Sequence, residues 1–369
     1  MQIERCEKCG FPINTKPGLI VKDGVCGACI VYEDRKNIDW NQREQEFVDL
    51  CNKYRNKYHQ YDGMCDCIIA VSGGKDSRAI TEKVLEQGMH PLTVTVTDSF
   101  DHTTAGTCNF NQYLEHYKLN NYTYTISHNL FKRATRAAFE ETGEHLKFVE
   151  YAIYTIPTKI AQAFDINLVF YGENSAHEYN GKPDGYDATP SVRAMSDKAL
   201  QEYNTIWKKH NITLEEVNSV RLLDYKPVPQ VVYMSYFFPW DSPRNLEIAK
   251  RSGFKTLAHE YNRQGVYNDD DYEQIDSVAY HVHLWGKYPK FGFQRVSDVA
   301  CRRVREGLIT KEEALKAIKE RDHILDQKAL EDFCNTCGYT IKEFWDIQDK
   351  WWNQDLFHKD EFGRWVLNE

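Results

Sequence analysis

The most reactive stretch of the sequence is a short polar loop, SGGKDS, at positions 72–77. Its glycines let the backbone approach oxygen atoms closely, and its serine hydroxyls, backbone N–H groups and lysine ammonium are all donors for an anion. An apolar run precedes the loop and a helix-length segment follows it, and the N-terminus of a helix favours negative charge. The sequence therefore predicts a phosphate-binding loop made of Ser72, Gly73, Gly74, Lys75, Asp76 and Ser77.

The aspartate in this loop needs its own explanation, because a carboxylate beside a phosphate is repelled unless it binds something else. We expect Asp76 either to hold Mg²⁺ or to fix the loop through backbone N–H groups. The sequence contains neither G-x-x-x-x-G-K-[ST] nor G-x-G-x-x-G. Transfer of a γ-phosphate and binding of a dinucleotide are therefore not indicated.

Four cysteines near the N-terminus have the spacing of a metal site. Cys6 and Cys9 form one Cys-x-x-Cys pair, and Cys26 and Cys29 form a second. Four thiolates in a tetrahedron suit zinc, and a site closed in this way leaves no coordination position for catalysis. We therefore predict a structural zinc ion, with an iron–sulfur cluster as the alternative.

One further cysteine pair has no second pair to complete a metal site. Cys334 and Cys337 have a spacing that places both on one face of a helix, where cysteines act as small apolar side chains. We favour this interpretation over a second metal site.

The elements that must position the loop are predicted from hydrophobic patterning. Between Cys67 and Trp240, short apolar runs bounded by turn residues alternate with segments of helical length, which predicts a parallel α/β sheet with crossover helices. The expected strands are CIIAVS, PLTVTVTDS, NYTYTISHN, INLVFYGEN and QVVYMSYFFPW. Open sheets of this kind bind ligands beyond the carboxyl ends of their strands, so Gly172, Glu173 and Asn174 are expected to face the same site as the loop.

The chain divides into four predicted parts. These are residues 1–36, a zinc-binding knuckle region; 37–62, an amphipathic connecting helix; 63–240, the α/β domain; and 241–369, a helical C-terminal region in which the strand signal stops. Pro157 falls inside a helix-length segment and is expected to weaken or kink that helix. Thr310 and Glu313 have the spacing of a capping box.

The composition argues against several classes of function. The chain has 369 residues and a net charge of −9, with 46 Lys and Arg against 55 Asp and Glu. It therefore has no overall attraction for nucleic acid or for an anionic membrane. No segment is apolar enough to span a membrane and the N-terminus lacks an export signal, so we predict a cytoplasmic protein with reduced thiols.

The six-residue loop resembles the S-G-G-x-D-S loop of the PP-loop ATP pyrophosphatases, a Rossmann-like superfamily related to adenine nucleotide alpha hydrolases that cleaves ATP between its α- and β-phosphates. The whole chain resembles a narrower group, the N-acetyl sugar amidotransferases that make acetamidino sugars for lipopolysaccharide O-antigen and for pseudaminic and legionaminic acids. The similarity follows five stretches in order: the cysteine knuckles with DGVCGAC, SGGKDS, YGENSAHEYNG, YFFPWDSPRNLEIAKRSGF and KFGFQRVSDVACRRVREGLITKEEA.

This resemblance implies an enzyme that uses ATP and Mg²⁺ and carries structural zinc. The N-acetyl oxygen of a sugar attacks the α-phosphorus, pyrophosphate departs into the loop, and ammonia then displaces AMP to leave an amidine. The residues implied in catalysis are Lys75 and Asp76 in the loop and Glu173 and Asn174 after the fourth strand. Asp76 and Glu173 are also the expected Mg²⁺ ligands.

Further residues are expected to contact the nucleotide or the sugar. Thr97 and Asp98, at the end of the second strand, are placed beside adenine by the resemblance. Glu178 and Tyr179 are expected to meet sugar hydroxyls; an ordinary turn is the alternative for the segment that follows the fourth strand. Arg295, at a helix start, is expected to meet a substrate carboxylate or phosphate.

Several charged and polar residues near Arg295 have no predicted contact with substrate. Ser297 and Asp298 are placed with it at the helix start. Three other arginines, Arg302, Arg303 and Arg305, are expected only as a charged helix face, and His281 and His283 are expected to be structural.

The expected partners are an N-acetylated sugar and a source of ammonia. The sequence shows no glutaminase motif, so ammonia is expected from a separate glutaminase subunit through a synthase-like channel subunit. One alternative is a tRNA thiolase of the PP-loop type, against which the acidic composition argues. Another is a zinc-knuckle scaffold whose loop only senses nucleotide.

Overall fold

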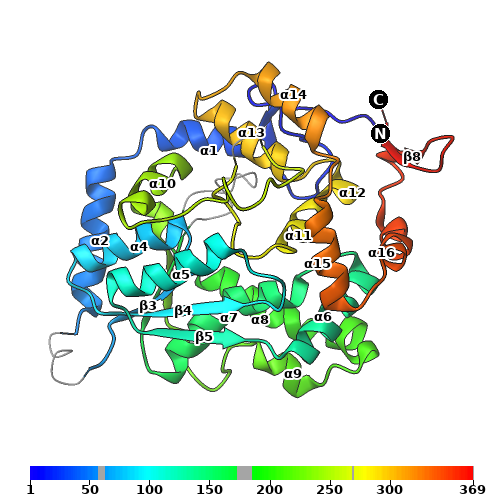
Figure 1. Cartoon of the computed structure of the whole chain (residues 1–369). Helices are drawn as coiled ribbons and strands as arrows, with labels where there is room; N and C mark the ends of the chain where they lie inside the picture. Colours follow the sequence, from blue (N-terminus) through cyan, green and yellow to red (C-terminus); the bar gives the residue numbers. More distant parts are fainter. Residues whose placement is uncertain (57–62, 173–184, 268–269, 369) are drawn as a thin grey trace.

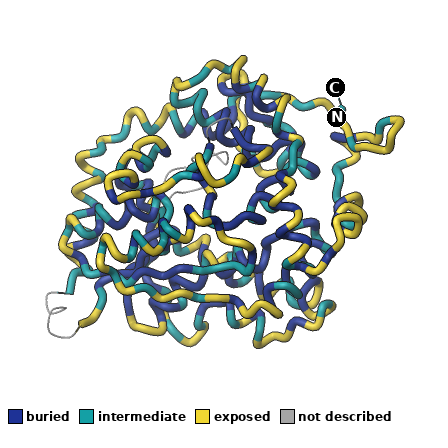
Figure 2. Tube along the Cα trace, in the orientation of Figure 1, coloured by how far each residue is buried: buried dark blue, intermediate teal, exposed yellow. Residues whose placement is uncertain are grey.

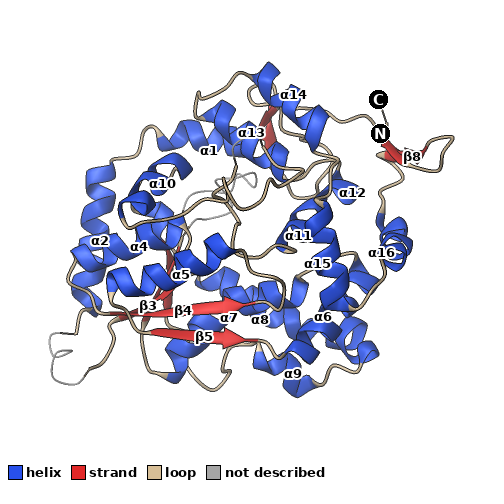
Figure 3. Ribbon diagram, viewed as in Figure 1, coloured by secondary structure: helices blue, strands red, loops and turns tan. Residues whose placement is uncertain are grey.

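The computed structural model describes residues 1–56, 63–172, 185–267 and 270–368. Its central feature is a five-stranded sheet in which every neighbouring pair is parallel, with the order β5-β4-β3-β6-β7 (Figures 1 and 3). The strands are β3 (Cys67–Ala70), β4 (Pro91–Thr97), β5 (Asn121–Thr125), β6 (Leu168–Tyr171) and β7 (Gln230–Tyr233). Each begins within an expected apolar run, so the predicted parallel α/β fold is confirmed.

Helices cover both faces of this sheet (Figure 3). Those in the α/β part of the chain are α2 (Trp40–Tyr54), α4 (Lys75–Glu86), α5 (Thr104–Tyr117), α6 (His128–Thr142), α7 (Lys147–Ala163), α8 (Thr189–Gln201) and α9 (Leu214–Ser219), with short turns η2 (Tyr203–Trp207), η3 (Lys208–His210) and η4 (Met234–Tyr236).

Alternating residues of the strands face two separate cores. Ile68 and Val169 belong to the core that includes apolar residues of α6, α7 and α8. Ile69 and Phe170 belong to the other core, which includes residues of α2, α4 and α5. Because successive strand side chains point to opposite faces, a strand buried on both faces is apolar along its length. This double burial explains why β3 and β6, in the middle of the sheet, read as continuous apolar runs, whereas the edge strand β5 has no buried residue.

Pro157 lies inside α7, and the helix continues through it. Proline has no N–H to donate to the carbonyl four residues earlier. The Tyr171 hydroxyl, on β6, donates to the carbonyls of Ile153 at 3.4 Å and Tyr154 at 2.7 Å. A side chain from the sheet therefore supplies a donor where the helix lacks one.

The C-terminal region consists mainly of helices, as predicted. They are α10 (Ser242–Arg251), α11 (Tyr280–Trp285), α12 (Lys287–Phe291), α13 (Arg295–Arg305), α14 (Lys311–Arg321), α15 (Gln327–Cys337), α16 (Ile341–Gln348) and the turn η5 (Asp349–Trp351). The expected capping box of Thr310 and Glu313 is present at the start of α14.

The expectation that strands stop after Trp240 is wrong. An antiparallel hairpin, β8 (Phe357–Lys359) and β9 (Trp365–Leu367), follows the last helix. Its strands are three residues each, too short to give a clear alternating pattern.

Helices α15 and α16 pack into the core of the α/β part. Phe333 and Phe344 are fully buried beside Phe139 of α6, with ring centroids of Phe139 at 5.8 Å and 5.1 Å from them. Cys334 and Cys337 lie on α15 and are buried in the same core, as the helical interpretation of this pair predicts. The C-terminal region therefore shares a hydrophobic core with the sheet.

The N-terminal segment contributes to a third core, in addition to the two that flank the sheet, and Figure 2 shows how burial varies along the chain. It contains a two-stranded hairpin, β1 (Val21–Lys22) with β2 (Val25–Cys26), followed by α1 (Gly27–Arg35). The four N-terminal cysteines and Phe11 are buried against residues of α13 and α14. Within the described part of the chain, no helix has the length and apolar character needed to cross a membrane.

Truncation of Phe333 tests whether the C-terminal helices share the main core. Phe333→Ala is expected to lower the free energy of unfolding by about 3–5 kcal/mol, because it empties a fully buried aromatic site. Urea denaturation followed by circular dichroism measures this change. Phe362→Ala is the control, since Phe362 is 73% exposed and its loss is expected to cost less than about 0.5 kcal/mol. Separate unfolding of the C-terminal helices, with the sheet unaffected, would contradict the shared core.

Candidate active site

The strand order reverses at β3, and this reversal places a site at the carboxyl edge of the sheet. From β3 the chain first adds β4 and β5 on one side and later adds β6 and β7 on the other. Open α/β sheets bind ligands at such a switch point. A cavity of about 560 Å³ lies here, and its lining includes Ser72, Gly74, Lys75 and Asp76 of the SGGKDS loop.

The loop joins β3 to α4 in a conformation that depends on glycine. Gly73 has φ +85°, and a Cβ at this position would lie 2.7 Å from the Cα of Phe110. Gly74 is the N-cap of α4 and has an ordinary φ of −68°. The Ser72 N–H donates to the Ser77 hydroxyl at 3.0 Å, which ties the start of the loop to the first turn of α4. The loop is therefore held open at a helix N-terminus, as an anion site requires.

A buried arginine supports the loop from behind. Arg78 has no exposed surface, and its guanidinium donates to the carbonyls of Gly73 at 3.4 Å and Asn109 at 2.9 Å and to both the carbonyl and hydroxyl oxygens of Ser252. Burial lowers the pKa of Arg78. These bonds connect the loop to α5 and to the end of α10, so Arg78 fixes the loop relative to both helices.

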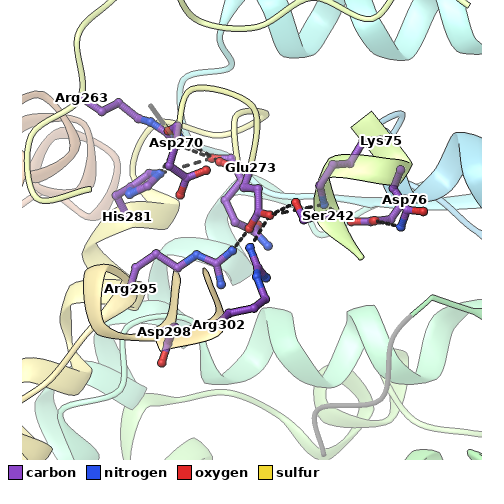
Figure 4. Close-up of polar contacts among 12 residues, drawn as sticks. Lys75, Asp76, Ser242, Arg263, Asp270, Glu273, His281, Arg295, Asp298 and Arg302 are labelled. Atoms are coloured by element: carbon purple, nitrogen blue, oxygen red, sulfur yellow. Dashed lines mark hydrogen bonds and ion pairs between the residues drawn. The ribbon is translucent and has the colours of Figure 1, made fainter. Parts of the chain in front are cut away.

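Lys75 and Asp76 point into the cavity region from the first turn of α4 (Figure 4). Lys75 is only 8% exposed, and its Nζ lies 2.6 Å from Asp76 Oδ2. The other carboxylate oxygen of Asp76 accepts a hydrogen bond from the Asn245 side chain at 2.7 Å. Both oxygens of Asp76 are therefore engaged by side chains that fix the loop, rather than by backbone N–H groups as one expectation had it.

A second group of charges meets the loop at Glu273 (Figure 4). Its carboxylate is 6% exposed and pairs with Arg295 through Oε2 and with Arg302 through Oε1 at 2.6 Å. The same Oε1 accepts from the Ser242 hydroxyl and lies 3.7 Å from Lys75 Nζ. One buried carboxylate thus joins the phosphate loop to helix α13.

The segment that carries Glu273 is held by another buried arginine. Arg263 donates to the carbonyls of Asp270, Glu273 and Gln274, the latter two at 3.0 Å and 2.9 Å, and also to His281 Nε2. Burial is the main cause that lowers the pKa values of Arg263 and His281. His281 lies on α11 and accepts this bond, in agreement with the structural role expected for it.

A buried carboxylate also fixes the start of α13. Asp322, directly after α14, accepts from the backbone N–H groups of Gln294 at 3.2 Å and Ser297 at 3.1 Å and from the Ser297 hydroxyl at 2.6 Å. Burial raises the pKa of Asp322 to about 6. Asp298 pairs with Lys287. Ser297 and Asp298 lie with Arg295 in the first turn of α13, as expected, and both make contacts within the C-terminal region.

The arginines of α13 correct another expectation. Arg302 and Arg305 line the cavity, so they are not merely a solvated face. The Arg305 guanidinium also lies 3.7 Å from the Cys9 sulfur. Arg303 does not line this cavity and instead lies over the Tyr267 ring at 4.5 Å.

The remaining expected site residues are only partly described. Thr97 and Asp98 end β4 but are not among the residues that line the cavity; the Thr97 hydroxyl contacts Thr125 at 3.0 Å, and burial raises the pKa of Asp98. Gly172 lies beside a lining residue, since a Cβ on it would be 3.3 Å from Trp240. Four expected residues, Glu173, Asn174, Glu178 and Tyr179, lie outside the described residues.

Several lining residues were missed by sequence reasoning. Asp276 lines the cavity next to Glu273; burial raises its pKa to about 6, and a hydrogen bond with Ser72 opposes that rise. Ser242 and Trp240 lie in the stretch YFFPWDSPRNL, which the sequence had singled out without assigning roles. The spacing of Arg295 and Arg302 was a usable signal, because residues seven apart on a helix lie on one face. Glu273 and Asp276 follow an irregular segment and offered no such pattern.

The four N-terminal cysteines form one compact cluster. Their sulfur atoms all lie within 4.8 Å of one another, with 3.8 Å between Cys6 and Cys29 and 3.7 Å between Cys9 and Cys26. A tetrahedron with Zn–S distances of about 2.3 Å has S–S edges of about 3.8 Å. The cluster is compatible with the predicted structural zinc.

The cysteine cluster supports the same helix that carries the cavity arginines. Cys301, on α13, is fully buried in the core formed by the cluster, and the Phe11 and Phe293 rings pack with centroids 4.8 Å apart. The Lys311 ammonium donates to the Glu7 carbonyl at 2.9 Å. The N-terminal segment therefore helps to place α13 against the cavity.

The fold and the site define a class of protein: an α/β protein with an SGGKDS loop at the switch point of a five-stranded parallel sheet, a four-cysteine cluster and a helical C-terminal region. The C-terminal part has a more particular relation. Residues 259–369 match the family model described as LPS biosynthesis protein WbpG-like, C-terminal domain. This match agrees with the resemblance drawn from the sequence motifs. No curated protein sequence matches the chain.

Solved structures give only weak global likenesses. The NH3-dependent NAD synthetase from Campylobacter jejuni has 11% identity and a TM-score of 0.28, covering 50% of this chain and 92% of its own. NMN synthetase from Francisella tularensis has 12% identity and a TM-score of 0.28, covering 60% and 90%. NAD+ synthetase from Burkholderia pseudomallei has 10% identity and a TM-score of 0.30, covering 87% and 93%. The fold assignment rests on the strand order and not on these values.

The two loop glycines give a matched test of the loop geometry. Gly73→Ala is expected to lower the free energy of unfolding by about 2 kcal/mol or more, because a side chain at φ +85° is strained and meets the Phe110 backbone. Gly74→Ala is expected to cost less than about 0.5 kcal/mol, since its φ is ordinary and only the Ser72 hydroxyl is near. Urea unfolding measures both, and equal losses would show that the loop has another conformation.

Metal analysis tests the cysteine cluster. The purified protein is expected to contain one zinc ion per chain, and Cys9→Ser is expected to lose it and to lower the melting temperature, because zinc binding contributes to folding. Elemental mass spectrometry and thermal denaturation are the measurements. Cys334→Ser is the control, since Cys334 is buried in a different core. Retention of full zinc by the Cys9 variant would overturn the assignment.

Proposed function

We propose that the chain is an ATP-dependent amidotransferase that converts the N-acetyl group of a sugar into an acetamidino group, with release of AMP and pyrophosphate. The sugar is a component of bacterial lipopolysaccharide or of a related surface glycan such as a nonulosonic acid. The matched family model is described as an LPS biosynthesis protein, and this description supports a surface glycan as the destination of the product. The reaction type is supported by the loop and by its resemblance to the PP-loop ATP pyrophosphatases.

One observation carries the proposal. Lys75, from the phosphate loop, and Arg302, from the WbpG-like domain, contact the same oxygen of Glu273 in one cavity. An ATP-activating loop and a domain associated with polysaccharide biosynthesis therefore face a shared space. A reaction between ATP and a sugar requires such a space, because both reactants must be held together before either bond changes.

In the first step the amide oxygen of the sugar attacks the α-phosphorus of ATP. The bond between the α-phosphorus and the bridging oxygen breaks, and pyrophosphate leaves with the electron pair. The loop backbone N–H groups, the Ser72 hydroxyl and Lys75 are placed to stabilise the charge that accumulates on that leaving group. Arg78 keeps Gly73 and the loop in the required position.

In the second step ammonia attacks the carbon of the adenylated imidate. A C–N bond forms, the C–O bond to AMP breaks, and loss of one proton from the attacking nitrogen leaves the amidine. Asp276, which lines the cavity beside the loop, is placed to accept a proton in this step. Ammonia is proposed to come from a separate glutaminase subunit through a synthase-like channel subunit.

Mg²⁺ and zinc have different proposed roles, since the first belongs to the reaction and the second to the fold. ATP enters as its Mg²⁺ complex, so Mg²⁺ belongs to the substrate. Lys75 and Asn245 donate to the two carboxylate oxygens of Asp76 and so fix the loop, and Asp76 and Glu173 are the residues proposed to hold this Mg²⁺. Zinc, where the four cysteines hold it, stabilises the fold and supplies no step of the reaction.

An assay with ATP, Mg²⁺, ammonium and a panel of N-acetylated nucleotide sugars and nonulosonic acids tests this function. Wild-type protein is expected to release AMP and pyrophosphate with one member of the panel, and mass spectrometry is expected to show a product lighter by about one mass unit, as oxygen is exchanged for NH. Lys75→Met is expected to lower kcat/KM by roughly 10²-fold or more.

The control for this assay is Lys250→Met, which removes an exposed lysine of α10 that does not line the cavity. Its activity is expected to match the wild type. Absence of AMP formation with every sugar would contradict the proposal. Incorporation of sulfur into tRNA would favour the thiolase alternative, and nucleotide binding without turnover would favour the sensing scaffold.

A further inference from the structure

We propose that the N-terminal segment forms one wall of the substrate cavity, where Tyr32 and Trp40, together with Trp240, hold the ring of the sugar by its apolar face. This inference rests on the proposed function, because it assigns the sugar a place in the same cavity. It gives a substrate role to a segment whose other role is structural. The ligand assigned to the wall is a pyranose ring and not a nucleobase.

The wall brings together three aromatic side chains from separate parts of the chain. Tyr32 lies on α1, Trp40 is the first residue of α2, and Trp240 lies between β7 and α10. All three line the cavity that contains the phosphate loop, and none of them is fully buried. Large aromatic side chains normally gain stability by burial, so three that stay partly exposed around one cavity provide an apolar surface for a ligand.

Contacts with two cations hold the rings of this wall in place. The guanidinium carbon of Arg35 lies 4.8 Å from the ring centroid of Trp40. The Lys36 ammonium lies 5.2 Å from the ring centroid of Tyr32. Arg35 also donates to the carbonyl of Ser235 at 2.9 Å, which fastens the end of α1 to the segment between β7 and α10. A wall that is fixed before binding loses little freedom when a ligand arrives.

The cysteine cluster fixes the start of the same wall. Helix α1 begins at Gly27, directly after Cys26, and Cys29 lies in its first turn. Tyr32 follows Cys29 by about one helical turn. The cluster also packs against α13, whose arginines line the cavity. The cluster therefore links the aromatic wall to the rest of the cavity lining.

Two carboxylates of the same cavity favour a sugar as the ligand. Asp241, directly after Trp240, and Glu306, at the end of α13, both line it. Asp241 uses one oxygen to cap α10, and a carboxylate has about four acceptor sites in total. A pyranose combines an apolar C–H face with several hydroxyl donors at its edge. A nucleobase offers fewer donors to such acceptors, so an aromatic wall with carboxylates beside it suits a sugar better.

The wall reaches the edge of the sheet at which the reaction is proposed to occur. A Cβ on Gly172, which follows β6 directly, would lie 3.3 Å from the Trp240 ring. Lys75 and other residues of the phosphate loop line the same cavity of about 560 Å³. A sugar ring on the wall therefore keeps its N-acetyl group in the space that receives the α-phosphorus of ATP, as the first step requires.

A binding experiment on the full chain tests this wall without requiring turnover. The protein is first loaded with Mg²⁺ and a non-hydrolysable ATP analogue, so that the nucleotide already occupies its own place. N-acetylglucosamine and N-acetylneuraminic acid are then titrated as sugar probes, and uridine is the nucleobase probe. Saturation-transfer difference NMR measures each dissociation constant. At least one sugar probe is expected to bind, and uridine is expected not to displace it.

Three variants separate ring recognition from a loss of structure. Trp40→Ala is expected to weaken sugar binding by about 3–10-fold, because it removes an aromatic surface, whereas Trp40→Phe is expected to stay within about twofold of the wild type. Trp345→Ala is the matched control, since Trp345 is an exposed tryptophan of α16 that does not line the cavity. Thermal denaturation checks the folding of each variant, and Tyr32→Ala provides the same test from α1 where Trp40→Ala fails to fold.

The outcomes distinguish this inference from the proposed function. The inference is overturned if neither sugar probe binds, if uridine displaces the sugar, or if the Trp40→Ala variant binds the sugar as tightly as the wild type. The proposed function fails separately, if no sugar supports AMP formation in the turnover assay while a sugar probe still binds in a manner that depends on Trp40.

Discussion

The organisation of the site depends on one buried carboxylate. Glu273 attracts Lys75 from the phosphate loop and Arg295 and Arg302 from α13, and a buried charge of this kind is tolerated only when cations and hydrogen bonds surround it. This requirement brings the α/β part and the C-terminal domain together at a single cavity. The four-cysteine cluster and Asp322 hold α13 in the position that the carboxylate needs.

Much of the fold was predictable from the sequence because the central strands of the sheet are buried on both faces. Strands such as Leu168–Tyr171 consist almost entirely of apolar residues, and turn residues or helix-length segments separate them. The C-terminal hairpin was missed, because its three-residue strands give almost no alternating pattern. The donor that compensates for Pro157 in α7 could not be predicted locally, because the hydroxyl comes from Tyr171 on a different element.

The site was predictable where its residues are consecutive in the chain and unpredictable where the fold brings them together. The composition of the loop from Ser72 to Ser77 predicts an anion site, and the spacing of the cysteine pairs predicts a metal site. Glu273 has no local signal, because its role arises only when Arg263 fixes its segment against α13. Arg302 was assigned to a solvated face, since a run of arginines on a helix does not reveal which one faces a cavity.

A crystal structure with a non-hydrolysable ATP analogue and an N-acetylated sugar acid or sugar phosphate tests the central claim most directly. We predict that the β- and γ-phosphates lie in the loop at residues 72–77, that the sugar lies in the same cavity, and that the N-acetyl oxygen lies about 3–3.5 Å from the α-phosphorus. A complex in which the γ-phosphorus faces the acceptor, or in which the sugar binds outside this cavity, would contradict the account.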